Sequence, residues 1–360
     1  MINCKFELNN SYKKNLIGLT LVVKPTNNET ISKYKINSEL GHGSVGRVYL
    51  LEFLNKNEYV IKISNKNCKD ELINELDIFK IYLKKNNINN KIFPIYYGEI
   101  ENTYNFAIIY NYLGCYNLDD FKINHYNLFS FNNNIDIIKQ LILQLISFDN
   151  VIHCDFKSSN IIIDIKDNII IPTITDMGLS NLEIPDQIVL STNYVTSPES
   201  LLTLPNYNKC LVDKKDLNIK KHDYFGLFVF ILNLFLIKNY WNILSVYLTT
   251  ELNININFLN KHESSVIYVY VWYKFNNSYS NNKSLKNIIY KIEKNYPELL
   301  KMNFINFDNF FKLYILPNLN LKLIEENKIL ELYNFLLLLI KFDPDDRPHI
   351  ELLLQNIFLN

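Results

Sequence analysis

Three glycines lie within six positions of this chain, at Gly41, Gly43 and Gly46, although the whole sequence contains only eight. Glycines at this spacing let backbone N–H groups approach phosphate oxygens without interference from a Cβ atom. Two kinds of nucleotide-binding unit use such a cluster, and the residues that follow it distinguish them. A dinucleotide-binding βαβ unit would begin a helix directly after the third glycine.

The residues after the glycines instead predict two β-strands joined by a short turn. Residues 48–53 and 59–63 are rich in β-branched, aromatic and other apolar side chains, and Asn55-Lys56-Asn57 lies between them. Apolar runs of this composition around a short polar break are typical of a hairpin. We therefore expect the glycines to join two strands and to cover a bound nucleotide.

Further motifs follow the hairpin in a fixed order. They are Lys62 in the second strand, His153-Cys154-Asp155-Phe156-Lys157-Ser158-Ser159-Asn160, Asp176-Met177-Gly178, Ser197-Pro198-Glu199 and Asp343-Pro344-Asp345-Asp346-Arg347-Pro348. Together with the glycines they resemble the conserved motifs of eukaryotic-type protein kinases, among them the catalytic loop H-R-D-x-K-x-x-N, D-F-G and A-P-E. The lysine two positions after the aspartate of the catalytic loop resembles the Ser/Thr branch.

The resemblance implies an α+β fold with two lobes. A small, β-rich N-lobe with one regulatory helix is expected at residues 35–110, and the hinge with a larger, mainly helical C-lobe at residues 111–360. Residues 1–34 form an N-terminal extension to which we assign no role. Two stretches, about residues 200–222 and 245–335, are longer than in a minimal kinase. We expect insertions on the surface of the lobe, with a docking site for a partner as the alternative.

The regulatory helix is expected at about residues 69–84, where Leu72, Leu76, Phe79 and Leu83 recur at helical spacing. Glu75 lies at the margin of this apolar stripe, from which it can reach Lys62. The resemblance implies that Glu75 orients Lys62. Because 13 positions separate the two residues, fewer than is usual in the family, Glu71 is the alternative partner. A solvated surface glutamate is the simpler interpretation of either acid.

The resemblance also implies a chemical role for each polar residue of the motifs. Phosphoryl transfer requires chiefly positioning and countercharge. Asp155 would accept the proton of the substrate hydroxyl, and Lys157 would neutralise charge on the transferred group. Asn160 and Asp176 would supply oxygen ligands to Mg²⁺, with Mn²⁺ as the alternative ion.

ATP is the cofactor that the resemblance implies. Val60 stands where an alanine usually covers the adenine, and Tyr110 would guard the back of the adenine pocket. The residues implied to contact the nucleotide are Gly41, Gly43, Gly46, Val48, Val60, Lys62, Asn111, Leu113 and Ile162.

Besides Val60, two further substitutions distinguish this chain from the family pattern. Cys154 replaces the arginine that commonly binds a phosphate on the activation loop, and Met177 replaces the phenylalanine of D-F-G. A non-RD kinase of this kind is expected to be active without phosphorylation of that loop.

The leading interpretation is a Ser/Thr protein kinase that transfers the γ-phosphate of ATP to protein hydroxyls. The main alternative is a pseudokinase scaffold that retains the fold without efficient turnover. A small-molecule kinase is a further alternative, disfavoured by the glycine loop and by the pairing expected between Glu199 and Arg347.

Composition limits the partners and the location. Lys plus Arg and Asp plus Glu both number 37, so the formal net charge is zero, and we expect no nucleic acid or anionic membrane as a partner. The five cysteines show no metal-type pairing, which favours reduced thiols in the cytoplasm. The apolar run from Tyr224 to Ile237 is too short for a membrane span and is expected to be the buried central helix of the large lobe. One alanine and two arginines favour an AT-rich genome, such as that of a large DNA virus, which would place the chain in the host cytoplasm or the virion.

Overall fold

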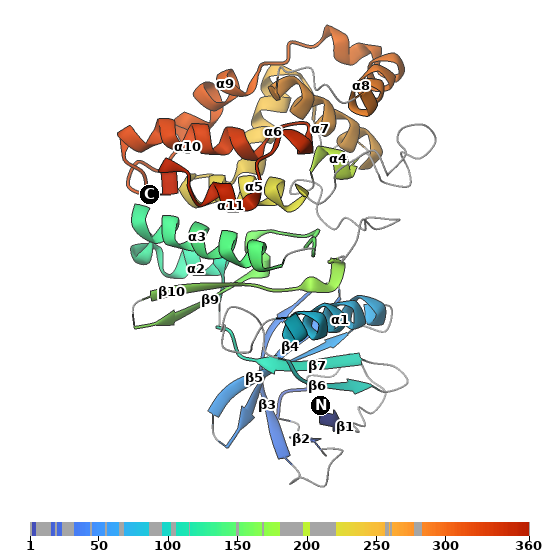
Figure 1. Ribbon diagram of the computed structural model, residues 1–360, viewed down its shortest axis with the longest axis vertical. Coiled ribbons are helices and arrows are strands. Elements are labelled where there is room, and N and C mark those ends of the chain that lie inside the picture. Colours follow the sequence, from blue (N-terminus) through green and yellow to red (C-terminus); the bar gives the residue numbers. More distant parts are fainter. Residues whose placement is uncertain are drawn as a thin grey trace. The chain divides into compact units, whose positions relative to one another are not determined.

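The computed structural model of the chain describes residues 2–4, 16–18, 20–23, 32–43, 45–54, 56–64, 68–85, 96–101, 106–114, 116–148, 151–167, 169–180, 197–201, 221–255, 259, 261–276 and 283–359. These residues fall into two compact units (Figure 1). The N-terminal unit comprises Met1–Asp120 and Ser159–Ser180, and the C-terminal unit comprises Phe121–Ser158 and Asn181–Asn360. The first is built on β-sheets and the second mainly on helices, so the α+β, two-lobed fold expected from the sequence is confirmed.

A seven-stranded sheet dominates the N-terminal unit, in the order β1-β6-β7-β5-β4-β3-β2. The strands are β1 (Ile2–Cys4), β2 (Thr20–Val23), β3 (Ser32–His42), β4 (Gly46–Phe53), β5 (Lys56–Ser64), β6 (Tyr96–Glu101) and β7 (Phe106–Asn111). All neighbouring strands are antiparallel except β1 and β6, which are parallel. The predicted hairpin after the glycines corresponds to β4 and β5.

The two faces of this sheet have different surroundings. Tyr49 pairs with Ile61, and Ile61 pairs with Ile109; these side chains belong to an apolar core cluster on one face. Because side chains alternate between faces along a strand, Lys62 and its cross-strand partner Val48 lie on the opposite face. The sheet therefore separates an apolar core from the face that carries the lysine.

Helix α1 (Lys69–Lys85) covers the face that carries Lys62 (Figure 1). Leu72, Leu76 and Phe79 of its apolar stripe are buried, and the Phe79 ring lies 6.5 Å from that of Tyr110 in β7. The helix predicted at about residues 69–84 is thus confirmed, although the side chain of Leu83 lies outside the described residues.

A smaller three-stranded sheet completes the N-terminal unit, in the order β10-β9-β8. Its strands are β8 (Tyr116–Asn117), β9 (Ile161–Lys166) and β10 (Ile169–Ile174). The pairing of Ile174 with Ile161 at the end of the hairpin brings the residues that follow β10 beside the residue that precedes β9. The short 3-10 helix η4 (Met177–Leu179) follows this hairpin.

Helices form most of the C-terminal unit. They are α3 (Phe131–Ser147), α4 (Pro198–Leu201), α5 (Asp223–Phe235), α6 (Tyr240–Glu251), α7 (Lys261–Asn276), α8 (Lys283–Asn295), α9 (Phe307–Phe310), α10 (Glu326–Leu339) and α11 (Ile350–Leu353), while α2 (Leu118–Asn124) begins at the junction of the units. Every residue of α5 except Asn233 is buried, as the apolar run from residue 224 predicted. Among the helices that the structure describes, none is both long and apolar enough to span a membrane.

Part of the long stretch at about residues 245–335 belongs to the core rather than to a surface insertion. Trp272 of α7 is fully buried and meets the rings of Phe225 and Phe228 of α5 edge-on, at centroid distances of 4.7 and 5.4 Å. Edge-to-face aromatic pairs add to the free energy of burial. The expectation of a surface loop is therefore wrong for α7. Most of the other expected insertion, residues 202–220, lies outside the described residues.

A buried guanidinium joins two segments of the C-terminal unit. Arg347 is only 2% exposed; its Nε donates to the carbonyl of Lys341 at 2.9 Å, and its Nη1 donates to the carbonyl of Lys221 at 2.8 Å. Lys221 Nζ in turn donates to the carbonyl of Arg347. The side chain of Glu199, the partner expected from the sequence, lies outside the described residues, so that pairing stays a prediction.

Arg347→Ala should destabilise the C-terminal unit, because it removes the charged donor of hydrogen bonds to two partly buried carbonyls. Hydrogen bonds to charged groups contribute about 1.5–3 kcal/mol each, so we expect the free energy of unfolding to fall by about 3 kcal/mol or more. Urea denaturation measures this change. The other arginine of the chain provides the control: Arg47 is exposed and pairs with Glu39 at 3.1 Å, so Arg47→Ala should unfold at nearly the wild-type urea concentration. Equal midpoints for the two variants would contradict a structural role of Arg347.

Gly46→Ala should destabilise the N-terminal unit. A Cβ atom on Gly46 would lie 2.0 Å from the carbonyl oxygen of Ile63 in the neighbouring strand, whereas a Cβ on Gly41 would meet no atom within 4 Å. Forcing extra atoms into a packed site costs about 1–3 kcal/mol. Thermal unfolding should therefore show a lower midpoint for Gly46→Ala and an unchanged one for Gly41→Ala.

Candidate active site

A buried lysine binds two carboxylates in the N-terminal unit. Lys62 Nζ lies 2.6 Å from Glu75 Oε2 and 2.7 Å from Asp176 Oδ1. The Glu75 side chain is 2% exposed and that of Asp176 is 37% exposed. The structure thus brings together three sequence-predicted site residues from β5, α1 and the segment after β10.

Burial and charge act in opposite directions on this cluster. Burial alone would lower the pKa of Lys62, but the carboxylates of Asp176 and Glu75 raise it above its ordinary value. Burial raises the pKa of Glu75, an effect that Lys62 only partly offsets. The lysine therefore keeps its charge, and the exposed side of Asp176 is where a ligand can approach the cluster.

Glu71, the alternative partner of Lys62, has a different environment. It lies one helical turn before Glu75 and is partly buried, and burial, followed by the charge of Asp176, raises its pKa. Lys62 Nζ donates its hydrogen bond on this helix to Glu75 Oε2. A separation of 13 positions is therefore compatible with an ion pair between β5 and α1.

The backbone at Asp176 adopts a left-handed conformation, with φ 64° and ψ 62°. Such a conformation costs an L-residue about 1–2 kcal/mol, so neighbouring contacts have to hold it. On the N-terminal side, the N–H and the hydroxyl of Thr175 donate to the carbonyl of Asn160 at 2.8 and 3.1 Å. Asn160 and Asp176, the two expected metal ligands, are thus linked through Thr175.

The three glycines of the loop differ in their surroundings. The N–H of Gly43 donates to the carbonyl of Gly46 at 2.9 Å and closes the turn. Gly46 allows β4 to approach the backbone of β5, while Gly41 and Gly43 border open space. Gly46 is thus required for packing, and Gly41 and Gly43 are the positions where a ligand could approach the backbone closely.

The remaining residues expected at the nucleotide belong to the same unit. Val60 pairs with Tyr110 and Val48 with Lys62, so the two valines share the face of Lys62. Asn111 ends β7 and Leu113 follows it, both partly buried. Ile162 is a partly buried residue of β9.

The first part of the catalytic-loop motif, from His153 to Ser158, belongs to the C-terminal unit. Lys157 Nζ lies 2.7 Å from Asp155 Oδ2, and the backbone N–H of Asp155 donates to Nδ1 of His153 at 3.3 Å. Asp155 is buried and Lys157 is partly buried. The structure therefore places the expected base and the expected countercharge in direct contact.

Asp223 holds this loop, and the sequence did not identify it as a site residue. Its carboxylate accepts hydrogen bonds from the backbone N–H groups of His153 at 2.7 Å and Cys154 at 3.1 Å. Cys154 is buried and has a left-handed backbone, with φ 64°. The signal for Asp223 was a carboxylate at the start of an otherwise apolar helix, where a charge needs a partner.

The residues present fit a divalent ion that is held mainly by phosphate. Asn160 and Asp176 offer the hard oxygen donors that Mg²⁺ prefers. Within the described part of the chain, no cluster of three or more His, Cys, Asp or Glu side chains could hold a metal. Two protein ligands that leave other positions to phosphate and water match the usual way in which proteins bind Mg²⁺.

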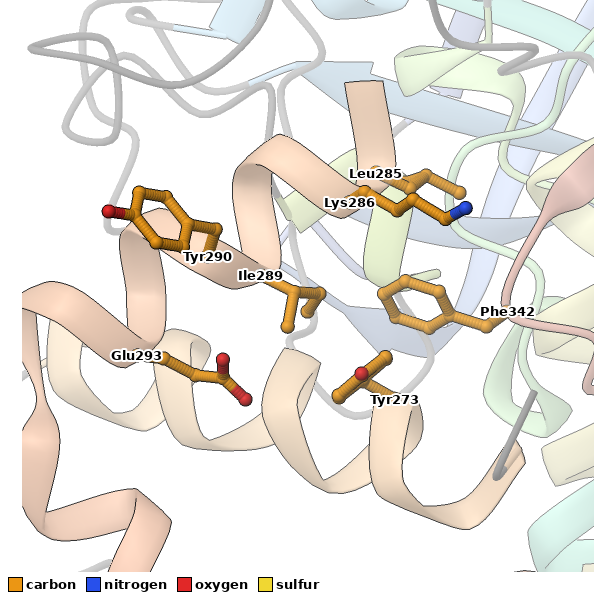
Figure 2. Close-up of a pocket in the computed structure, with 7 residues that line it drawn as sticks. All are labelled: Tyr273, Leu285, Lys286, Ile289, Tyr290, Glu293 and Phe342. Carbon is orange, nitrogen blue, oxygen red and sulfur yellow. The ribbon is translucent and has the colours of Figure 1, made fainter. Parts of the chain in front are cut away.

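An apolar pocket of about 230 Å³ lies elsewhere, in the C-terminal unit. Figure 2 shows Ile289 and the rings of Tyr273 and Phe342 gathered around it, with Tyr290 on the outer side. The carboxylate of Glu293 in its wall accepts a hydrogen bond from the Tyr270 hydroxyl at 2.9 Å. None of the residues that line it belongs to the candidate site.

Two comparisons relate the chain to known proteins. The family described as "Protein kinase domain" matches residues 34–359. The chain is also similar to a "Probable serine/threonine-protein kinase KIN1 homolog" of Enterocytozoon bieneusi (strain H348), with 28% identity over 212 residues. That alignment covers 56% of this chain and 33% of the relative, so the chain spans about a third of the relative's length.

Lys62→Met should make the stability of the protein more dependent on pH. Burial raises the pKa of Glu75 from 4.5 to about 7 while the lysine is present, and loss of the cation should raise it further. A carboxyl group whose pKa is higher in the folded state than in the unfolded state makes the protein less stable, by about 1.4 kcal/mol per pH unit, as pH rises from the unfolded-state pKa to the folded-state pKa. In wild type, the effect of Glu75 on the free energy of unfolding should thus level off above about pH 7, whereas the variant should continue to lose stability above that pH. Thermal unfolding from pH 5 to 9 measures this difference.

The matched control is the double variant Lys62→Met, Glu75→Gln, which removes the titrating carboxyl group. The melting temperature of the double variant should not show the additional decrease with pH that the single variant shows. If the single and double variants showed the same profile above pH 7, Glu75 would not be the group that the lysine neutralises.

Proposed function

Because the chain belongs to the eukaryotic-type protein kinase superfamily, we propose that it is a Ser/Thr kinase that transfers the γ-phosphate of ATP to hydroxyls of protein substrates. The observation that carries this proposal is the contact of Lys62 with both Glu75 and Asp176. This contact places a cation beside a partly exposed carboxylate on the face of the sheet opposite the apolar core. The named relative, a probable Ser/Thr kinase, supports the choice of acceptor.

In the N-terminal unit, Lys62 donates to the α- and β-phosphate oxygens, and Glu75 fixes the direction of its ammonium group. Gly41 and Gly43 let the loop approach the phosphates, while Gly46 keeps the loop packed on β5. Val48, Val60, Asn111, Leu113 and Ile162 surround the adenine and ribose. Asn160 and Asp176 hold Mg²⁺, which when bound neutralises phosphate charge.

In the C-terminal unit, Asp155 accepts the proton of the substrate hydroxyl. Lys157, 2.7 Å from Asp155 Oδ2, turns from this carboxylate to the transferred phosphoryl group. Asp223 holds the backbone of the loop, so the position of Asp155 is fixed before substrate binds. Preorganisation of this kind is what phosphoryl transfer chiefly requires of a protein.

The remaining expectations stay predictions. The hinge is expected to begin at Asn111. Apart from α7, the insertions are still expected on the surface of the lobe, with a docking site for a partner as the alternative. The protein substrate is a proposal, because the alignment with the relative covers only part of each chain. The cytoplasmic location and the AT-rich or viral source are proposals that rest on composition.

Asp155→Asn should abolish phosphoryl transfer while leaving nucleotide binding intact. Loss of a general base lowers the rate by about 10²–10⁴, so transfer of radiolabelled phosphate from Mg·ATP to the chain itself or to a generic protein substrate should fall by that factor. Isothermal titration with Mg·ATP, measured on both proteins, shows whether the binding site is retained.

Two outcomes would count against the proposal. If wild-type protein bound Mg·ATP but labelled substrate no faster than Asp155→Asn, the chain would be a pseudokinase scaffold. If it bound no adenine nucleotide at millimolar concentration, the roles assigned to Lys62 and Asp176 would be wrong.

A further inference from the structure

The side chain of Asn74 joins helix α1 to the segment that follows Asp176. Its Nδ2 donates to the carbonyls of Gly178 at 3.0 Å and Ser180 at 2.8 Å, and lies 3.5 Å from the carbonyl of Met177. Asn74 directly precedes Glu75 on α1. The same turn of the helix thus contacts both Lys62 and the segment from Met177 to Ser180.

The amide group of Asn74 can donate to the backbone carbonyls that this segment presents. A primary amide carries two N–H donors, and the two closest carbonyls accept one each. Gly178 lies within η4 and Ser180 directly follows it. The hydrogen bond from the Ser180 N–H to the carbonyl of Met177 at 3.0 Å closes this turn. A neutral side chain with donors therefore satisfies carbonyls that would otherwise need water or another partner.

Packing brings the turn close to the helix. A Cβ atom on Gly178 would lie 3.4 Å from the carbonyl oxygen of Glu71, so the backbone of the turn lies against α1. Ser180 is fully buried, and its hydroxyl donates to Sδ of Met177 at 3.2 Å. Modification of Ser180 would therefore require this turn to open.

The strained backbone of Asp176 needs contacts on both sides. Asn160 holds the N-terminal side through Thr175, and the bonds from Asn74 hold the C-terminal side. The bonds from Asn74 therefore help to keep Asp176 in its left-handed conformation.

We propose that Asn74 is a positioning residue that holds Asp176 ready for its metal by binding the Met177–Ser180 turn to α1 through neutral hydrogen bonds, without an activation-loop phosphate. This inference rests on the proposed function, since it assigns Asp176 to the metal. It also fits the burial of Cys154, which provides no cation for a phosphate at that position.

The test compares four variants of the full chain with wild type. Asn74→Ala removes the amide, Asn74→Asp keeps its shape but loses the donors, and Asn74→Gln keeps the donors on a longer chain. Asp77→Ala, on the exposed part of the same helix, is the control. All proteins are first treated with phosphatase, and their melting temperatures are recorded.

Two measurements separate positioning from general stability. Hydrogen exchange at residues 177–180 reports on the turn, with the amides of β5 as an internal reference. Titration with Mg·ATP and with ATP in EDTA reports on the contribution of the metal to affinity. Because two hydrogen bonds are lost, we expect exchange at the turn to accelerate about 10-fold or more in Asn74→Ala and Asn74→Asp.

The same variants should lose about 10-fold in affinity for Mg·ATP and in kcat, with unchanged affinity for metal-free ATP. In these quantities Asn74→Gln should lie between those two variants and wild type, and Asp77→Ala should match wild type. Unchanged exchange at the turn would overturn the inference, as would faster exchange with unchanged affinity for Mg·ATP. Loss of wild-type activity on phosphatase treatment would overturn the independence from phosphate. If wild type bound no nucleotide, the proposed function would fail and with it the role of Asp176, while the exchange data would still decide whether Asn74 holds the turn.

Discussion

The buried ammonium of Lys62 is the constraint on which the N-terminal unit depends. An ion removed from water costs several kcal/mol unless partners compensate it. Glu75 and Asp176 provide that compensation at 2.6 and 2.7 Å, and they come from a helix and from the segment after a hairpin. Strand, helix and loop must therefore be correctly placed together, because displacement of any one leaves a charge uncompensated. The chemistry proposed for the site uses the same three groups.

Close contacts between backbones support this arrangement and explain where a glycine-poor chain keeps its glycines. A Cβ atom at Gly46, Gly114 or Gly226 would lie 2.0, 2.1 or 2.6 Å from the carbonyl oxygen of Ile63, Ile163 or Phe156, respectively. These contacts lie between β4 and β5, beside β9, and between α5 and the catalytic loop. Although the chain contains few glycines, it therefore keeps these three at positions where no side chain fits. Packing accounts for Gly46, whereas the phosphate contact proposed above concerns Gly41 and Gly43, which border open space.

Polar side chains at helix positions fix the segments that carry the site. Asp223 at the start of α5 binds the backbone of the catalytic loop, and Asn74 on α1 binds the turn after Asp176. Both act on backbone groups, so the conformations of Cys154 and Asp176, each with φ 64°, are held from neighbouring helices. In both cases a helix holds a strained segment: Asp176 is itself a residue of the candidate site, and Cys154 directly precedes one, Asp155.

The sequence by itself determined the family, the hairpin after the glycines, helix α1 with its buried stripe and the apolar helix α5, because these depend on motif order and on the periodicity of apolar residues. Tertiary structure decided which glutamate binds Lys62, since Glu71 and Glu75 lie one turn apart and only packing selects between them. It also decided that α7 lies in the core. The sequence did not predict this burial, because a helix that is apolar on most sides has no periodicity that marks one buried face. The partners of Asn74 and Asp223 could not be identified from sequence, because they are backbone carbonyls and N–H groups that every residue carries, and only the fold brings particular ones within reach.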